Sequence, residues 1–263
     1  MNSYTGTLED HLRAKRAEGR KLLLPYVTAG YPIDDWPRLI EGFASAGADA
    51  MEIGIPFSDP VMDGPTIQEA SSIALEHGMN PLSALATVAT TDPGVPLIAM
   101  TYYNVAYHMG HERFASELRK AGICAAILPD LPLEEVGPWA DVADAIGVET
   151  VMLAAPTAPD ERLPRVVDRA RGFVYGVGLV GITGERAELA ASATQMASRL
   201  KAVTDKPVII GIGVSNAEQA VEISQIADGV VVASAIIRRM LEGGSIEQAI
   251  DFVGELRTAL DRV

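Results

Sequence analysis

Three carboxylates lie within twelve residues of one another, in the segment Glu52-Ile-Gly-Ile-Pro-Phe-Ser-Asp59-Pro-Val-Met-Asp63. Glu52 stands inside an otherwise apolar run, where a carboxylate either faces a functional cavity or costs free energy. Burial at that position would raise its pKa and suit it to general acid–base catalysis. The alternative interpretation is a structural glutamate that is hydrogen-bonded to neighbouring backbone.

Asp59 and Asp63 follow in a loop that contains three prolines. Proline restricts the backbone, and proton transfer requires groups that are held in place. Aspartates beside proline and glycine are also common in turns, so either residue alone would favour the turn interpretation. Together with Glu52, they place three carboxylates at the end of one predicted strand, and this grouping favours a catalytic site.

Small residues follow the last three apolar runs of the chain. The motifs are Gly181-Ile-Thr-Gly184, Gly211-Ile-Gly213-Val-Ser215 and Ala233-Ser234-Ala235. Glycine allows backbone amides to approach phosphate oxygens, and a helix that starts beside them favours an anion. Glycine also serves tight turns, so one such motif is weak support. The last two motifs, Gly211-Ile-Gly213-Val-Ser215 and Ala233-Ser234-Ala235, follow adjacent strands and together predict a phosphorylated small-molecule substrate.

Other reactive residue types are poorly placed for alternative chemistry. No lysine falls at the carboxyl end of a predicted strand, which disfavours a Schiff-base aldolase. We interpret His108 and His111 as solvated loop residues and predict no metal site. Cys124 lies in an apolar run and is interpreted as a buried, unreactive thiol. These observations indicate carboxylate acid–base chemistry without a metal or a covalent intermediate.

A repeated pattern of short aliphatic runs and amphipathic segments must position these groups. The predicted strands span residues 22–27, 50–55, 97–101, 125–128, 150–154, 173–177, 208–211 and 229–232. The predicted helices span 36–46, 67–76, 113–121, 134–145, 161–170, 195–203, 217–226, 235–241 and 245–262. Eight strand–helix units in 263 residues predict a parallel (β/α)₈ (TIM) barrel, formed as a single domain over residues 1–263. Active sites of such barrels lie at the carboxyl ends of the strands.

Two further signals refine the barrel prediction. The segment Thr7-Leu-Glu-Asp10 resembles a capping box, which predicts an extra N-terminal helix that closes the base of the barrel. The turn after the first strand, Thr28-Ala-Gly-Tyr-Pro32, lacks the glycine fingerprint of a dinucleotide-binding sheet. An open, doubly wound sheet is therefore disfavoured.

Composition limits the partners of the chain. Hydrophobic residues make up 48% and aromatic residues 5% of the sequence, which predicts an aliphatic core around buried parallel strands. The net charge of −14 disfavours binding to nucleic acid. The first residues do not resemble a signal peptide, and no apolar stretch approaches the roughly 20 residues that cross a bilayer. We therefore expect a cytoplasmic protein without a membrane partner.

The segment from Glu52 to Gln68 closely resembles the signature of the tryptophan synthase α subunit family. The likeness extends over nearly the whole chain and includes 25–32, Tyr102-Tyr-Asn104, 129–132 and the three glycine or serine motifs. It implies retro-aldol cleavage of indole-3-glycerol phosphate to indole and glyceraldehyde 3-phosphate, within L-tryptophan biosynthesis. It also implies that this chain carries no cofactor, because pyridoxal phosphate belongs to a separate β subunit.

The resemblance assigns roles residue by residue. Glu52 would transfer protons at indole C3 and at the departing hydroxyl, and Asp63 would engage the indole N–H. Thr183 would hydrogen-bond the Asp63 carboxylate. The implied substrate-binding residues are Tyr175, Thr183, Gly184, Gly213, Ser234 and Ala235, and the residues implied to face the β subunit are Phe57, Asp59 and Asn104.

The chain departs from its relatives at two places. Gly178 and Leu179 stand where many relatives carry a hydroxyl and often a basic residue, which predicts a looser lid over the substrate. Ala233 replaces a more usual glycine before Ser234. Three functions stay open: a subunit of an α2β2 complex that passes indole to its β subunit, a stand-alone lyase that releases indole, and a weakly active homologue that binds and activates a β subunit. The long signature disfavours another phosphosugar barrel.

Overall fold

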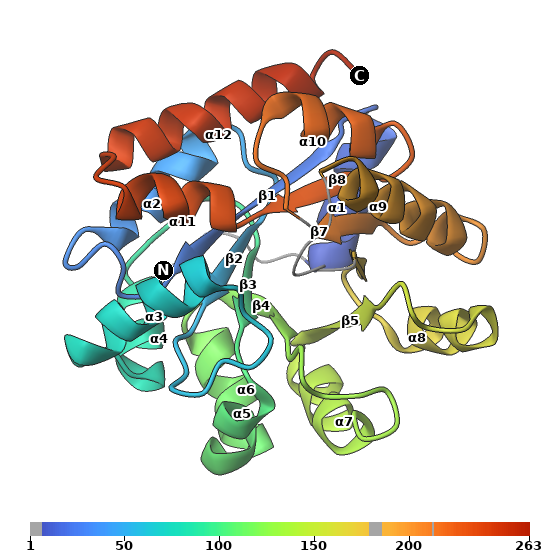
Figure 1. Ribbon diagram of the computed structural model, residues 1–263. Coiled ribbons are helices and arrows are strands. Elements are labelled where there is room, and N and C mark those ends of the chain that lie inside the picture. Colours follow the sequence, from blue (N-terminus) through green and yellow to red (C-terminus); the bar gives the residue numbers. More distant parts are fainter. Residues whose placement is uncertain (1–6, 179–185, 212) are drawn as a thin grey trace.

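Eight parallel strands close into a barrel in the computed structural model, which describes residues 7–178, 186–211 and 213–263. Each strand pairs with the next, and β8 pairs with β1, so the described sheet has no free edge (Figure 1). The strands are β1 (Leu22–Thr28), β2 (Met51–Gly54), β3 (Leu97–Met100), β4 (Ile123–Ile127), β5 (Glu149–Ala154), β6 (Val174–Val177), β7 (Val208–Gly211) and β8 (Gly229–Val232). The predicted (β/α)₈ barrel is confirmed, and every predicted strand ends within two residues of the observed one.

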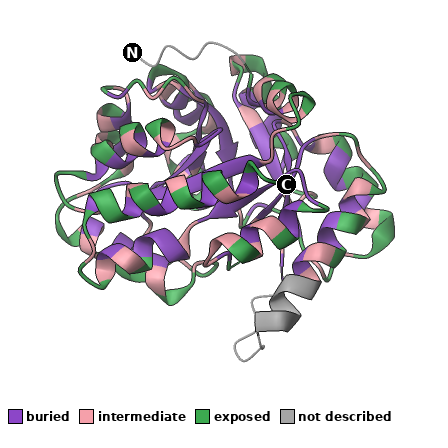
Figure 2. Cartoon of the chain, turned by 90° about the horizontal axis from the view of Figure 1, so that it is seen from above, coloured by how far each residue is buried: buried purple, intermediate pink, exposed green. Residues whose placement is uncertain are grey.

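Helices surround the strands, with their buried residues turned inward and their exposed residues turned outward (Figure 2). None of the described helices is long and apolar enough to cross a membrane. The helices are α1 (Leu8–Ala17), α2 (Trp36–Ser45), α3 (Pro65–Glu76), α4 (Pro81–Val88), α5 (Tyr103–Met109), α6 (His111–Lys120), α7 (Gly137–Ile146), α8 (Leu163–Arg169), α9 (Arg186–Lys201), α10 (Ala217–Ser224), α11 (Ser234–Leu241) and α12 (Ile246–Leu260), with a short 3₁₀ turn at Asp160–Arg162.

The sequence analysis missed two of these helices, α4 and α5, and placed the start of α9 too late. A capping box starts α4, because the Asn80 side chain accepts from the Ser83 amide and the Ser83 hydroxyl accepts from the Asn80 amide. Its buried face consists of small and medium side chains, so the apolar periodicity is weak. The seven residues of α5 have a single buried position, Ala106, and show no apolar stripe.

The predicted N-terminal helix is confirmed as a plug in the base of the barrel. Thr7 caps α1, because its side chain accepts from the Asp10 amide at 3.2 Å. Leu8 and Leu12 are fully buried and pack with the side chains that fill the barrel interior. These interior side chains include Leu22, Leu24, Ile98, Val151, Phe173 and Ile209.

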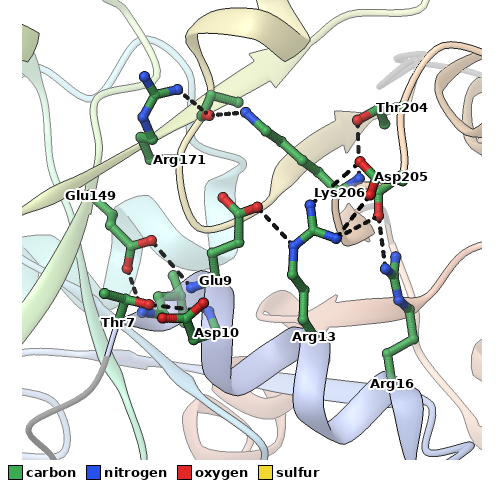
Figure 3. Close-up of polar contacts among 12 residues, drawn as sticks. Thr7, Glu9, Asp10, Arg13, Arg16, Glu149, Arg171, Thr204, Asp205 and Lys206 are labelled. Atoms are coloured by element: carbon green, nitrogen blue, oxygen red, sulfur yellow. Dashed lines mark hydrogen bonds and ion pairs between the residues drawn. The ribbon is translucent and has the colours of Figure 1, made fainter.

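Polar contacts hold α1 in that position (Figure 3). Glu149, at the start of β5, accepts hydrogen bonds from the amides of Leu8 and Glu9. The first amides of a helix lack partners within the helix, so this carboxylate satisfies two of them. Arg13 donates to the Glu9 carboxylate at 2.9 Å and to the Asp205 carboxylate at 3.2 Å. The second contact links α1 to the segment before β7.

Asp49 joins β1, β2 and α12 at the same end of the barrel. Its Oδ2 accepts from the Leu23 amide at 2.9 Å and from Arg257 at 3.2 Å. Its Oδ1 accepts from Arg20 at 2.6 Å. Asp49 and Arg257 are both buried, so their charges depend on this contact. Asp49 lies two residues before Met51, the first residue of β2, so its bonds to Leu23 and Arg257 fix where β2 begins. Glu52 follows three residues after Asp49.

We predict that Asp49→Ala lowers the free energy of unfolding by about 3 kcal/mol, the lower end of the range for breaking a buried ion pair. Among the described residues, Arg257 would keep only the half-exposed Asp261 as a carboxylate partner. Urea denaturation at pH 7 measures the loss. The control is Asp205→Ala, which removes an exposed partner of Arg13 and should cost less than about 1 kcal/mol. Equal losses in the two variants would contradict the assignment.

Candidate active site

A cavity of about 400 Å³ opens at the carboxyl ends of the strands. Its wall is built from loops after several strands, together with residues of α3, α10 and α11. Residues from four separate parts of the predicted site line it: Asp63, Tyr175, Gly213, Ser234 and Ala235. The fold therefore brings together side chains and backbone that are more than 100 residues apart in the sequence.

Glu52 is almost completely buried in β2, at 1% exposure. It pairs in register with Tyr26 of β1 and Ile98 of β3, and Ala50, two residues earlier, packs in the barrel interior. No hydrogen bond to the Glu52 side chain is found in the described part of the chain, and its Oε1 is buried without a partner there. The interpretation as a structural glutamate therefore lacks the backbone partners that it requires there.

Burial raises the pKa of Glu52 to about 8. The physical cause is desolvation, because a carboxylate that has lost water and gained no hydrogen bond is unstable in its charged form. Glu52 consequently holds a proton at neutral pH and can donate it. A pKa this close to neutrality also allows the group to take a proton back, as general acid–base catalysis requires.

Two tyrosines and two glycines pack near Glu52, in the part of the barrel interior closest to the carboxyl ends of the strands. A Cβ on Gly54 would lie 1.8 Å from the Tyr26 hydroxyl, and a Cβ on Gly211 would lie 2.1 Å from the Tyr175 hydroxyl. Each glycine thus leaves space for the aromatic ring of a neighbouring strand. Burial raises the pKa of both tyrosines, and the nearby Glu52 contributes to the shift of the Tyr175 pKa. Both phenols therefore remain neutral.

Asp63 is held by Tyr102, the residue just before α5. The Tyr102 hydroxyl accepts from the amides of Met62 at 2.8 Å and Asp63 at 3.1 Å, and it donates to the Asp63 carboxylate at 3.1 Å. Phe57 stacks on the Tyr102 ring, with 5.2 Å between ring centroids. Burial raises the pKa of Asp63, and the hydrogen bond from Tyr102 opposes that shift. One side chain thus fixes both the loop and its carboxylate.

Sequence reasoning did not assign this role to Tyr102. The motif Tyr102-Tyr-Asn104 was noted, yet a role was expected only for Asn104. Burial raises the pKa of Tyr102 to about 12, so it remains a neutral donor to Asp63. Its partner lies 39 residues away in the sequence, and no local spacing indicates the contact.

The phosphate-binding end predicted from the sequence is partly described. Gly213 has a positive φ of 47° and is exposed, a conformation that favours glycine. Ser234 begins α11, and its amide and that of Ala235 lie in the first turn, where amides have no partner within the helix. Thr183, Gly184 and Leu179 lie outside the described residues, while Gly178 is the last described residue before them.

The residues predicted to face a partner lie outside the cavity wall. Asp59 and Asn104 are exposed, and Phe57 is half-buried against Tyr102. Two neighbouring apolar side chains of the same loop, Val61 and Met62, are 80% and 56% exposed.

The histidines and the cysteine that were interpreted as non-catalytic also have defined positions. His108 and His111 are not loop residues: His108 is exposed on α5, and His111 begins α6. His111 lies 3.0 Å from the Tyr103 hydroxyl and makes a T-shaped ring contact with Trp139. Cys124 is buried as predicted, and burial raises the pKa of its thiol to about 12. Among the described residues, no group of three or more histidine, cysteine, aspartate or glutamate side chains is arranged to hold a metal ion.

Comparison with known proteins places the chain. The family model described as tryptophan synthase alpha chain matches residues 12–260. The tryptophan synthase alpha chain of Streptomyces coelicolor is 43% identical over 92% of this chain and 90% of the relative. The tryptophan synthase alpha chain of Thermobifida fusca is 39% identical over 95% of this chain and 96% of the relative. The chain belongs to the tryptophan synthase alpha chain family. The family and the enzyme class expected from the motif, a carbon–carbon lyase of tryptophan biosynthesis, are confirmed.

Solved structures of the tryptophan synthase alpha chain family share the fold. A structure of Mycobacterium tuberculosis tryptophan synthase has a TM-score of 0.89 at 35% identity, covering 98% of this chain and 99% of that one. The Legionella pneumophila alpha chain has a TM-score of 0.87 at 31% identity, covering 99% of both chains. The barrel is therefore the common fold of this family.

We predict that Glu52→Gln changes how stability depends on pH. The folded-state pKa of about 8 lies above the ordinary value of 4.5, so the native protein binds the Glu52 proton more tightly than the unfolded chain. The resulting stabilisation is complete below pH 4.5 and is lost as the pH rises through 8. Urea denaturation from pH 5 to 9 should show the Gln variant gaining stability relative to wild type up to about pH 8, with no further gain above it.

Glu69→Gln is the control for this titration, because Glu69 is an exposed carboxylate on α3. Its stability should follow that of the wild type across the whole pH range. A difference between Glu52→Gln and wild type that stays constant with pH would show that Glu52 is not protonated in the folded protein at neutral pH.

Proposed function

We propose that this chain cleaves indole-3-glycerol phosphate into indole and glyceraldehyde 3-phosphate, the reaction of the tryptophan synthase α subunit. The observation that carries the proposal is the buried carboxyl group of Glu52, which has no hydrogen-bond partner among the described residues. It lies near Tyr175, a residue of the wall of a cavity that Asp63 also lines. Membership of the alpha chain family supports it. The first turn of α11 offers free amides in the same cavity, which suits a phosphorylated substrate.

The chemistry requires two proton transfers around one carbon–carbon bond. Glu52 donates its proton to indole C3, which makes the ring electron-deficient. The resulting carboxylate then removes the proton from the hydroxyl of the adjacent side-chain carbon. The electrons of that O–H bond form the aldehyde carbonyl, and those of the broken carbon–carbon bond return to the indole ring. A group with a pKa near 8 can perform both transfers at neutral pH.

Asp63 would act on the opposite edge of the indole ring system. A carboxylate there accepts a hydrogen bond from the indole N–H and stabilises the positive charge that develops when C3 is protonated. Such stabilisation depends on a carboxylate that does not reorient during the reaction. Tyr102 provides this rigidity, because it binds the loop amides and the carboxylate together. Tyr102 is therefore a positioning residue in this proposal.

The phosphate would bind at Gly213, Ser234 and Ala235, with Tyr175 lining the cavity. The implied contacts of Thr183 and Gly184 complete this set as proposals, since both residues lie outside the described part. The chain itself would require no cofactor. Pyridoxal phosphate would belong to a β subunit that receives the indole.

We also propose that the chain works in an α2β2 complex. Val61, Met62 and Tyr107 are exposed apolar side chains on the loop after β2 and on α5, both at the carboxyl end of the barrel. Exposed apolar side chains that group around a cavity mouth are typical of interaction surfaces. Phe57, Asp59 and Asn104 belong to the same two segments. The M. tuberculosis relatives are described as tryptophan synthase, in agreement with such an assembly.

We predict that the purified chain releases indole from indole-3-glycerol phosphate and that Glu52→Gln lowers kcat at least about 100-fold, since general acid–base catalysis contributes that much or more. Asp63→Asn should cost about the same, through lost stabilisation of charge. Glu69→Gln, which removes an exposed carboxylate on α3, should leave the rate unchanged. Chromatographic quantification of indole, with and without a β subunit, provides the measurement.

The outcomes of that assay separate the candidate functions. Turnover that depends on the β subunit supports the α2β2 enzyme, and full turnover without it supports the stand-alone lyase. Absence of indole under both conditions would leave a homologue that only binds and activates a β subunit. It would contradict the proposed activity.

We predict that Val61→Asp weakens binding of a β subunit at least about tenfold, because a charge would be buried at the interface. The control is Val203→Asp, which places the same charge on a 40% exposed valine before β7, at the opposite end of the barrel. Titration of the two proteins by calorimetry gives the affinities. Equal affinities in the two variants would remove the loop after β2 from the interface.

A further inference from the structure

Arg238 is one of only two charged side chains among the described residues that line the cavity. The other is Asp63, which follows β2, whereas Arg238 lies in α11, after β8. The cavity thus offers one acidic and one basic group to its ligand.

The Arg238 guanidinium has no carboxylate partner in the described part of the chain. The next residue shows what a structural arginine does on the same helix. Arg239 donates to the Ala235 carbonyl at 2.7 Å, and its guanidinium lies 3.5 Å from the centre of the Phe252 ring. An unpaired arginine is notable in a chain with 35 acidic and 21 basic residues, where potential partners are abundant.

The position of Arg238 relates it to the start of α11. It follows Ser234 by four residues, and residues with that spacing lie on the same face of a helix. Both residues line the cavity. The amides at a helix N-terminus carry only a partial positive charge, about half of one unit for the whole helix. A phosphate dianion there therefore lacks a full countercharge unless a cationic side chain reaches it.

We propose that Arg238 is a substrate-binding residue that supplies the countercharge for the substrate phosphate. The proposal rests on the proposed function, because it assumes a phosphorylated substrate whose phosphate lies at Ser234 and Ala235. The net charge of −14 repels such a ligand from the protein as a whole, and a cation at the cavity mouth opposes this repulsion locally. Arg238 is exposed, so salt screens its effect.

The role of Arg238 should appear in KM rather than in kcat. The phosphate is remote from the carbon–carbon bond that breaks, and its contact with Arg238 is the same in the ground state and the transition state. We expect Arg238→Gln to raise KM for indole-3-glycerol phosphate about fivefold at low ionic strength and to change kcat less than about twofold. The KM difference should shrink at high salt. Arg238→Lys should recover part of the loss, because it retains the charge.

The matched control is Arg262→Gln. Arg262 is also exposed and without a carboxylate partner among the described residues, and it follows the end of α12, near the base of the barrel. Both variants therefore change the net charge of the protein by the same amount. Equal increases of KM in the two variants would mean that the effect is general electrostatic repulsion, and the proposal would be overturned.

A binding experiment tests the phosphate directly. The probes are 3-(indol-3-yl)propyl phosphate, which lacks the hydroxyl needed for cleavage, and 3-(indol-3-yl)propanol, which also lacks the phosphate. We expect Arg238→Gln to weaken binding of the phosphate about fivefold in calorimetry and to leave the alcohol unaffected. Equal changes for both probes, or no change for either, would overturn the role of Arg238. If the wild-type chain binds neither probe, the proposed function itself fails, and the role of Arg238 fails with it.

Discussion

The carboxyl group of Glu52 lies inside a closed barrel, cut off from water and without a hydrogen bond in the described part of the chain, and the rest of the site depends on this burial. Desolvation raises its pKa to about 8 and keeps a proton on the group at neutral pH. An open sheet would let water reach the carboxyl group and restore its ordinary acidity. The continuous strand ladder prevents this, and the packing of Tyr26 over Gly54 and Tyr175 over Gly211 fills the space around Glu52. Burial of this one ionisable group thus gives it the pKa that the proposed proton transfer requires.

The two ends of the barrel have different roles: contacts at the base stabilise the fold, and the opposite end carries the candidate site. At the base, Asp49 and Arg257 form a buried ion pair, and α1 closes the interior with two leucines. These contacts hold β1 and β2 in register before the chain reaches Glu52. At the opposite end, the loops carry Asp63 and Tyr102, whose hydrogen bond fixes the second carboxylate. A rigid base allows the loops at the carboxyl ends of the strands to carry groups that contribute little to the stability of the fold.

Charge is distributed unevenly over this acidic protein. A net charge of −14 is unfavourable for any phosphorylated ligand, yet the described cavity wall carries a single acidic side chain, Asp63. The first turn of α11 offers amides and the Ser234 hydroxyl, and Arg238, one helical turn later, adds a cation without a carboxylate partner in the described part of the chain. Asp63 and Arg238 would engage opposite ends of a substrate that has an indole N–H at one end and a phosphate at the other. The same arrangement would orient the bond to be broken toward Glu52.

The sequence by itself determined the architecture and singled out Glu52 as the candidate acid. Eight aliphatic runs alternate with amphipathic segments, and this pattern is local, so it predicted the barrel and every strand within two residues. Glu52 was recognisable because a carboxylate interrupts an apolar strand. Only the tertiary structure decided how Tyr102 holds Asp63 and how Gly54 and Gly211 each accommodate a tyrosine. It also decided that Arg238 lines the cavity without a carboxylate partner among the described residues. Those contacts join residues that are distant in the sequence, and closure of the barrel sets their distances, whereas sequence periodicity reports only the face on which a residue lies.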